Sequence, residues 1–125
     1  MKALIVDDDD DIRTIGRLSL GRVGGMQVIE AASGPEGLAV AARERPDVVL
    51  LDVMMPGMDG AAVYARLREL PETAATPVVF MTAKVQRHEV ERLMGLGAVG
   101  VIAKPFDPMT LADEVRRLLT RSPSP

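Results

Sequence analysis

Five consecutive aspartates occupy residues 7–11, directly after the apolar run at residues 3–6. Two carboxylates about 4 Å apart repel each other by roughly 4 kcal/mol at an effective dielectric constant of ~20. A cation, a helix N-terminus or water must therefore compensate their charge. Carboxylates at a strand end suit a hard cation such as Mg²⁺, which prefers oxygen ligands. An acidic run of this kind is also typical of a solvated helix start.

Three other polar residues directly follow short apolar runs: Asp52, Thr82 and Lys104. In an open parallel sheet, ligands bind beside the carboxyl ends of the strands. We therefore expect these three side chains to share one rim of the sheet with Asp7 and Asp8. A metal ion and a lysine stabilise charge on a transferring phosphoryl group, and a carboxylate is able to act as the nucleophile. The set therefore predicts phosphoryl transfer to a carboxylate.

The elements that must position these residues alternate regularly. Five apolar runs, mostly continuous and rich in β-branched residues, are typical of strands buried on both faces. Helical patterns separate them, so the chain reads as (βα)5, with a doubly wound α/β sheet and right-handed crossovers. The runs cover residues 3–6, 27–31, 48–51, 78–81 and 100–103.

Local signals predict where the helices begin and end. Ser33 and Glu36 form a capping box, and Asp59 is placed to cap the third helix. Asp107 is expected to open the fifth helix, and the glycine pair at 24–25 is expected to end the first.

Several conspicuous residues have a structural interpretation. Residues 9–11 are expected to provide one N-cap and first-turn acids that complement the helix dipole. His88 lies in a helix rich in Arg and Glu and is expected to be solvated, neither a phosphohistidine nor a ligand. Met54, Met55 and Met58 are expected to pack within a loop.

Composition narrows the class of protein. The 125 residues fit one domain, and 47% are hydrophobic but only 2% aromatic, so the core must be aliphatic. A net charge of -3 and so few rings disfavour direct nucleic-acid binding. No apolar stretch approaches ~20 residues, so no membrane span is predicted. Met1 and Lys2 lead straight into a strand without a signal-peptide pattern, so we expect a cytoplasmic protein.

Four motifs together resemble the receiver domain of two-component response regulators. The motifs are LIVDD (4–8), LDVMMPGMDG (51–60), MTA (81–83) and KPF (104–106). The match runs from residue 2 to about 119. The resemblance implies a flavodoxin-like sheet of order 2-1-3-4-5, a receiver domain at 1–120, and a tail or the start of a linker at 121–125.

The resemblance also implies roles at the metal site. Asp52 would be the phosphoacceptor. Asp8, Asp52 and the backbone carbonyl of Met54 would bind Mg²⁺ (or Mn²⁺) directly, and Asp7 would bind it mainly through water. The backbone of Met54 would also lie beside the phosphoryl group.

Further roles follow for the other strand ends. Thr82, Lys104 and the backbone amide of Ala83 would contact the phosphoryl oxygens, and the Lys104–Pro105 bond would be cis. Receiver domains commonly carry an aromatic residue where this chain has Val101, which has few χ1 choices. We therefore expect a weaker or different rearrangement of the face formed by helix 4, strand 5 and helix 5.

Two other departures bear on function. Met54 and Lys84 occupy positions that tune hydrolysis in this family, and neither readily orients a water, so a comparatively long-lived phosphoryl group is predicted. Residues 99–102 form an apolar run where many DNA-binding relatives carry acidic residues that bridge a dimer. We expect this run to be a candidate protein contact if strand 5 is an edge strand.

The resemblance predicts phosphorelay signalling, with a sensor histidine kinase or a phosphotransfer protein as the phosphodonor. The domain would catalyse only its own phosphorylation and dephosphorylation, and so would not be an enzyme in the usual sense. Its target is an unknown protein that contacts the helix 4–strand 5–helix 5 face, and the chain is expected to be a monomer or weak dimer. It would be a single-domain regulator or part of a longer one.

Two alternatives share parts of this pattern. A small Mg²⁺-dependent phosphatase with an aspartyl nucleophile would use Asp7 with Asp9, but Asp11 stands where that family has Thr. A flavodoxin-like cofactor module needs a Ser/Thr/Gly-rich phosphate loop after the first strand. The aspartates at 7–11 would repel such a phosphate.

Overall fold

A five-stranded parallel sheet of order β2-β1-β3-β4-β5 forms the centre of the protein. The computed structural model describes residues 1–120, so the tail predicted at 121–125 lies outside the described residues. The predicted fold class and strand order are both confirmed. The strands are β1 (Lys2–Val6), β2 (Gln27–Ala31), β3 (Val48–Asp52), β4 (Val78–Thr82) and β5 (Gly100–Ala103).

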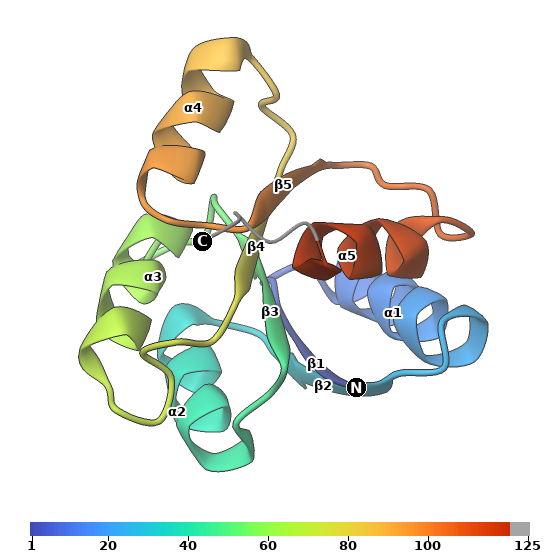
Figure 1. Ribbon diagram of the computed structural model, residues 1–125, viewed down its shortest axis with the longest axis horizontal. Coiled ribbons are helices and arrows are strands. Elements are labelled where there is room, and N and C mark those ends of the chain that lie inside the picture. Colours follow the sequence, from blue (N-terminus) through green and yellow to red (C-terminus); the bar gives the residue numbers. More distant parts are fainter. Residues whose placement is uncertain (121–125) are drawn as a thin grey trace.

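Helices cover both faces of the sheet (Figure 1). The core of one face joins the sheet to α2, α3 and α4, and the core of the other joins it to α5 and to the turn that extends α1. The central strands β3 and β4 are buried at every residue, as continuous apolar runs predict. The helices are α1 (Asp10–Leu18), α2 (Gly34–Glu44), α3 (Gly60–Glu69), α4 (Arg87–Gly95) and α5 (Leu111–Thr120).

Three predicted caps are present. Asp9 accepts hydrogen bonds from the backbone of Asp11 and Ile12 at the start of α1. Ser33 accepts one from Glu36, and Asp59 accepts one from Ala62. These side chains satisfy backbone N–H groups that have no partner within the helix.

The first helix differs from its prediction in its last turns. After Leu18 the chain widens into a single π-helical segment, η1 (Ser19–Val23), in place of a regular helix up to the glycine pair. A Cβ atom on Gly24 would lie only 2.4 Å from Cβ of Ala112, so α5 packs directly on this turn. Ser19 donates to the Pro108 carbonyl, and Arg116 donates to the Gly24 carbonyl. The wide π-helical turn thus allows the C-terminal end of the first helix to pack against α5.

The fifth helix begins later than predicted. Asp107 does not open α5, which begins at Leu111 after a turn. The Asp107 side chain accepts a hydrogen bond from Met109 N at 2.9 Å, and its carbonyl accepts one from Leu111 N at 3.0 Å. Asp107 therefore stabilises the turn that precedes α5, as Asp side chains commonly do in turns.

No helix within residues 1–120 has both the length and the apolar character needed to cross a bilayer.

Candidate functional site

The carboxyl ends of four neighbouring strands bring the predicted polar residues to one rim. Asp52 is the last residue of β3 and Thr82 the last of β4, whereas Asp7 and Lys104 directly follow β1 and β5. In the register Val6 faces Leu51, so Asp7 and Asp52 leave neighbouring strands at the same level. The parallel topology therefore assembles side chains that are up to 97 residues apart in the sequence.

Asp7 is completely buried and held from several directions. Its backbone N–H donates to the Ala31 carbonyl at 3.1 Å, which extends the pairing of β1 with β2 by one residue. Its Oδ1 accepts a hydrogen bond from Asp9 N at 2.9 Å. Asp7 is therefore fixed in place, and its remaining oxygen points to the centre of the site.

Lys104 joins the two buried carboxylates. Its Nζ donates to Oδ2 of Asp7 at 3.1 Å and to Oδ1 of Asp52 at 3.0 Å. The Lys104 side chain is 17% exposed and that of Asp52 only 4%. The Lys104–Pro105 peptide bond is cis, as the resemblance implies. Burial of these charges is tolerated because each is paired and hydrogen-bonded.

The three carboxylates that the sequence placed at a metal site do converge. Asp7, Asp8 and Asp52 each offer an oxygen, and these oxygens lie within 4.8 Å of one another. Three carboxylates and one ammonium leave an excess of two negative charges, which a divalent cation neutralises. The donor set consists of oxygen atoms, and Asp8 is exposed to water, which suits an ion that keeps part of its hydration shell. The residues therefore fit Mg²⁺.

The electrostatics of the site shift two titration equilibria. Burial raises the pKa of Asp52 from 3.8 to about 6, with a further rise from the charge of Asp7 and a partly opposing effect of Lys104. Burial alone would lower the pKa of Lys104. Its hydrogen bonds to Asp52 and Asp7 outweigh that effect, so its pKa lies above the usual value. Both shifts follow from charges confined in a region poor in water.

Thr82 completes the rim. Its side chain is buried, and its Oγ1 accepts a hydrogen bond from the backbone N–H of Lys84 at 3.0 Å. The Lys104 N–H donates to the Thr82 carbonyl at 2.9 Å, so the ends of β4 and β5 are joined at the site. Ala83 is exposed beside it.

Arg13 lies at the same rim and was not among the predicted site residues. Its Nη1 donates to the main-chain carbonyl of Asp7 at 2.7 Å, and its guanidinium also pairs with Asp10. The sequence feature that could have identified Arg13 is its spacing from Asp10, because residues three apart lie on the same face of a helix.

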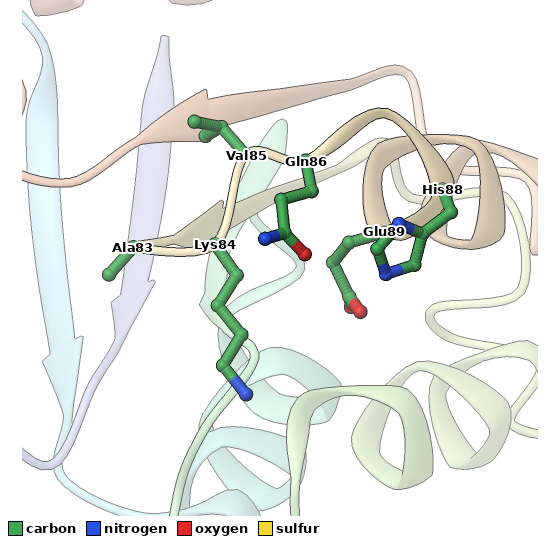
Figure 2. Close-up of a pocket in the computed structure, with 6 residues that line it drawn as sticks. All are labelled: Ala83, Lys84, Val85, Gln86, His88 and Glu89. Atoms are coloured by element: carbon green, nitrogen blue, oxygen red, sulfur yellow. The ribbon is translucent and has the colours of Figure 1, made fainter.

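A shallow cleft lies beyond Thr82, in the segment that leads into α4. Figure 2 shows the side chains of Gln86 and Glu89 between Lys84 and His88. His88 is exposed, as predicted, although it does line this cleft. Arg92 donates a hydrogen bond to Glu89 and lowers its pKa.

An apolar groove lies along α1 and η1, where they approach Pro108 in the segment after Lys104. Ile15 and Leu18 are 40% and 42% exposed, and Val23 is 51% exposed. Exposed apolar patches of this kind often mark contacts with other proteins. The groove is lined by Ile15, Leu18, Ser19, Arg22, Val23 and Pro108.

Two predictions about apolar residues need correction. Met55 is buried and Met58 packs against the core, but Met54 is 62% exposed and does not pack within the loop. The run at residues 99–102 lies in the edge strand β5 and the residue before it, but Gly100 and Ile102 are buried. Strand alternation turns the Ile102 side chain inward, and Leu118 of α5 packs closely over Gly100, so the run does not form a continuous exposed patch.

Comparison with known proteins gives a consistent result. The sequence pattern of the response regulator receiver domain matches residues 3–116. The chain is 39% identical over 120 residues to the transcriptional regulatory protein AfsQ1 of Streptomyces coelicolor, covering 94% of this chain and 51% of that protein. It is 37% identical over 118 residues to sporulation initiation phosphotransferase F of Bacillus subtilis, covering 94% of this chain and 93% of that protein.

The fold agrees with solved structures. The chemotaxis response regulator CheY4 of Vibrio cholerae superposes with a TM-score of 0.86 at 34% identity, covering 94% of this chain and 97% of that one. The chain spans about half the length of several of its curated relatives.

Proposed function

Because the chain belongs to the response regulator receiver domain family, we propose that Asp52 is the residue that accepts the phosphoryl group. Receiver domains are the phosphoacceptors of two-component systems and bind Mg²⁺ at an acidic triad, which here is Asp7, Asp8 and Asp52. Their partner in phosphoryl transfer is a histidine kinase or a phosphotransfer protein. Lys104 contacts both Asp7 and Asp52. Within residues 1–120, Asp7 accepts hydrogen bonds on both of its carboxylate oxygens, whereas Asp52 accepts them on Oδ1 alone, and this difference supports Asp52 as the nucleophile.

The transfer forms a bond between a carboxylate oxygen of Asp52 and phosphorus, and it breaks the bond from phosphorus to the imidazole nitrogen of the donor. A proton then goes to the released imidazole. Lys104 would stabilise the negative charge of the transferred phosphoryl group, since its ammonium already lies 3.0 Å from Oδ1 of Asp52. Mg²⁺ at the triad supplies neutralising charge for the phosphoryl oxygens.

The hydroxyl of Thr82 and the amide of Ala83 are proposed as further contacts of the phosphoryl group. Thr82 is supported by its burial at the end of β4, next to Lys104 in the register of the sheet. The backbone of Met54 is proposed to contact both the metal and the phosphoryl group, and Met54 N already donates to Oδ1 of Asp52 at 3.4 Å.

We infer that the donor protein docks on the apolar groove between α1, η1 and Pro108. The groove lies along α1, which begins two residues after Asp8, and it includes Pro108, four residues after Lys104. The face formed by α4, β5 and α5 stays the proposed contact for the target. A receiver domain over 1–120, a monomer or weak dimer, no direct contact with nucleic acid and a cytoplasmic location also stay predictions from the sequence.

The phosphatase alternative is set aside. Receiver domains are not classical enzymes, and Asp9, which the alternative needs as its acid, is occupied as the N-cap of α1. A flavodoxin-like cofactor module is disfavoured by the same carboxylates that suit Mg²⁺.

The direct test uses phosphoramidate, a small phosphodonor, with Mg²⁺ and detection by intact mass. The wild type should gain one phosphoryl group, and Asp52→Asn should gain none. Asp59→Asn is the matched control, because Asn caps helices as well as Asp and residue 59 accepts from the start of α3. Phosphorylation that persists in Asp52→Asn would contradict the proposal.

A further inference from the structure

Arg13 is held by three different segments at the base of the acidic rim. Its Nη1 donates to the Asp7 carbonyl at 2.7 Å, and its Nη2 pairs with Asp10 in the same turn of α1. Its Nε lies 3.5 Å from Oε1 of Glu30 in β2, and the side chain is only 14% exposed. An arginine so well enclosed is fixed in position.

We propose that Arg13 is a positioning residue that orients the Asp7–Asp8 peptide and thereby sets the affinity for Mg²⁺. The carbonyl that Arg13 holds belongs to the peptide that joins these two residues. Asp8 is exposed, whereas Asp7 is buried, yet their carboxylates must converge on one ion. Groups that orient metal ligands typically change metal affinity by 10- to 100-fold when they are removed.

A second hydrogen bond closes this turn from the other side. Asp9 N donates to Oδ1 of Asp7, so the Asp7–Asp8 peptide is bracketed by one bond to its carbonyl and one bond just beyond it. Without Arg13 the peptide keeps only one of these constraints. The Asp8 carboxylate then samples more positions, and binding the ion must restrict them.

The charge of Arg13 acts in the opposite sense to its hydrogen bond. A cation near the site repels Mg²⁺, although Asp10 and Glu30 offset much of this charge. If charge dominated, loss of Arg13 would strengthen Mg²⁺ binding. If positioning dominates, loss of Arg13 weakens it. The two roles therefore predict changes of opposite sign.

Arg17 provides a matched control on the same helix. Its Nε lies 3.0 Å from Oε2 of the same Glu30, but among the hydrogen bonds within residues 1–120 it donates none to Asp7. Substitution of Arg17 therefore removes an equal charge and a bond to Glu30 and leaves the Asp7 carbonyl untouched.

The test is a calorimetric titration with MgCl₂ of the wild type, Arg13→Lys, Arg13→Gln, Arg17→Gln and Asp8→Asn. We expect both Arg13 variants to bind about 10-fold more weakly and Arg17→Gln to stay within about twofold of the wild type. Lys keeps the charge but lacks the planar fork that reaches two acceptors. The deficit of Arg13→Lys should also persist at high ionic strength, where a pure charge effect is screened.

The inference rests on the acidic triad as the Mg²⁺ site, and the outcomes distinguish an error in the site from an error in the role of Arg13. If the wild type does not bind Mg²⁺, or Asp8→Asn binds as tightly as the wild type, the site itself is wrong. If Asp8→Asn loses binding while both Arg13 variants bind as the wild type does or more tightly, only the role of Arg13 is wrong. Melting temperatures in EDTA identify any variant that fails to fold, and Arg13→Lys is the conservative variant that keeps the test decisive.

Discussion

The first residue of α3, Gly60, packs its Cα directly against the main chain of Asp52. A Cβ atom at Gly60 would lie 2.5 Å from the Asp52 carbonyl oxygen, closer than such atoms approach in real structures. Gly60 N also donates to the Val53 carbonyl at 2.9 Å. The start of α3 is thus fitted against the end of β3, and the backbone position of Asp52, the proposed phosphoacceptor, depends on a residue without a side chain.

Substitution of Gly60 by Ala should therefore displace the end of β3. We expect a loss of about 1 to 3 kcal/mol in the free energy of unfolding, the usual effect of overpacking, together with slower phosphorylation. Urea denaturation and phosphoramidate labelling measure the two effects. Gly95→Ala is the control, since no atom lies within 4 Å of a Cβ there and Ala is favourable in a helix. Equal stability of the two variants would contradict this account.

In metal-free protein, the contribution of Asp52 to stability should fall as the pH rises from about 4 to 6. In this range Asp52 is protonated in the folded state, where its pKa is about 6, but ionised in the unfolded chain. The folded state then binds more protons, so the contribution of Asp52 to stability falls with rising pH and is lost above its folded pKa.

Asp52→Asn removes this dependence. At pH 7 in EDTA we expect it to be more stable than the wild type by up to about 3 kcal/mol, the equivalent of a pKa shift of about two units. Saturating Mg²⁺ should reverse the order, because it stabilises the protein with the intact triad more strongly. Denaturation curves from pH 4 to 8, with Asp59→Asn as control, check both points. A wild type whose stability rises across this range relative to Asp52→Asn would refute the burial argument.

The phosphoryl group on Asp52 is expected to be long-lived, because neither Met54 nor Lys84 readily orients a water for attack. Met54→Asn introduces an amide that is able to hold a water beside the acceptor. It should shorten the lifetime by about threefold or more, since positioning of a reactant accounts for large rate effects. Met109→Asn is the matched control, with 67% exposure against 62% for Met54. The decay of mass-detected phosphoprotein gives the rates, and unchanged decay in Met54→Asn would count against the prediction.

Activation should move the region of Val101 only weakly. Val101 pairs with Phe80 in the sheet and packs against the core shared with α3 and α4. A β-branched side chain in this setting has no aromatic-type swing available. Backbone chemical shifts recorded with and without beryllofluoride and Mg²⁺ should change most around Asp52 and Thr82. A large change centred on Val101 would contradict the expectation.

Most of the fold follows from local patterns. The strand runs and the caps at Asp9, Ser33 and Asp59 agree with the structure. The order of the sheet, which the family resemblance implied, agrees as well. The errors lie where one element adapts to another. The π-helical turn at Ser19–Val23 and the late start of α5 arise from contacts between these two segments, which no local pattern encodes.

The sequence by itself determined which chemical groups end each strand, and therefore that carboxylates, a hydroxyl and an ammonium would meet at one rim. Motif spacing was enough for this, because parallel strands must end on the same edge of a sheet. Only the tertiary structure decided their environment: how deeply Asp7 and Asp52 are buried, that Lys104 bonds both, and that Arg13 holds the Asp7 carbonyl. Burial and hydrogen-bond geometry depend on residues brought together from distant parts of the chain, and they set the pKa of Asp52 and the shape of the metal site.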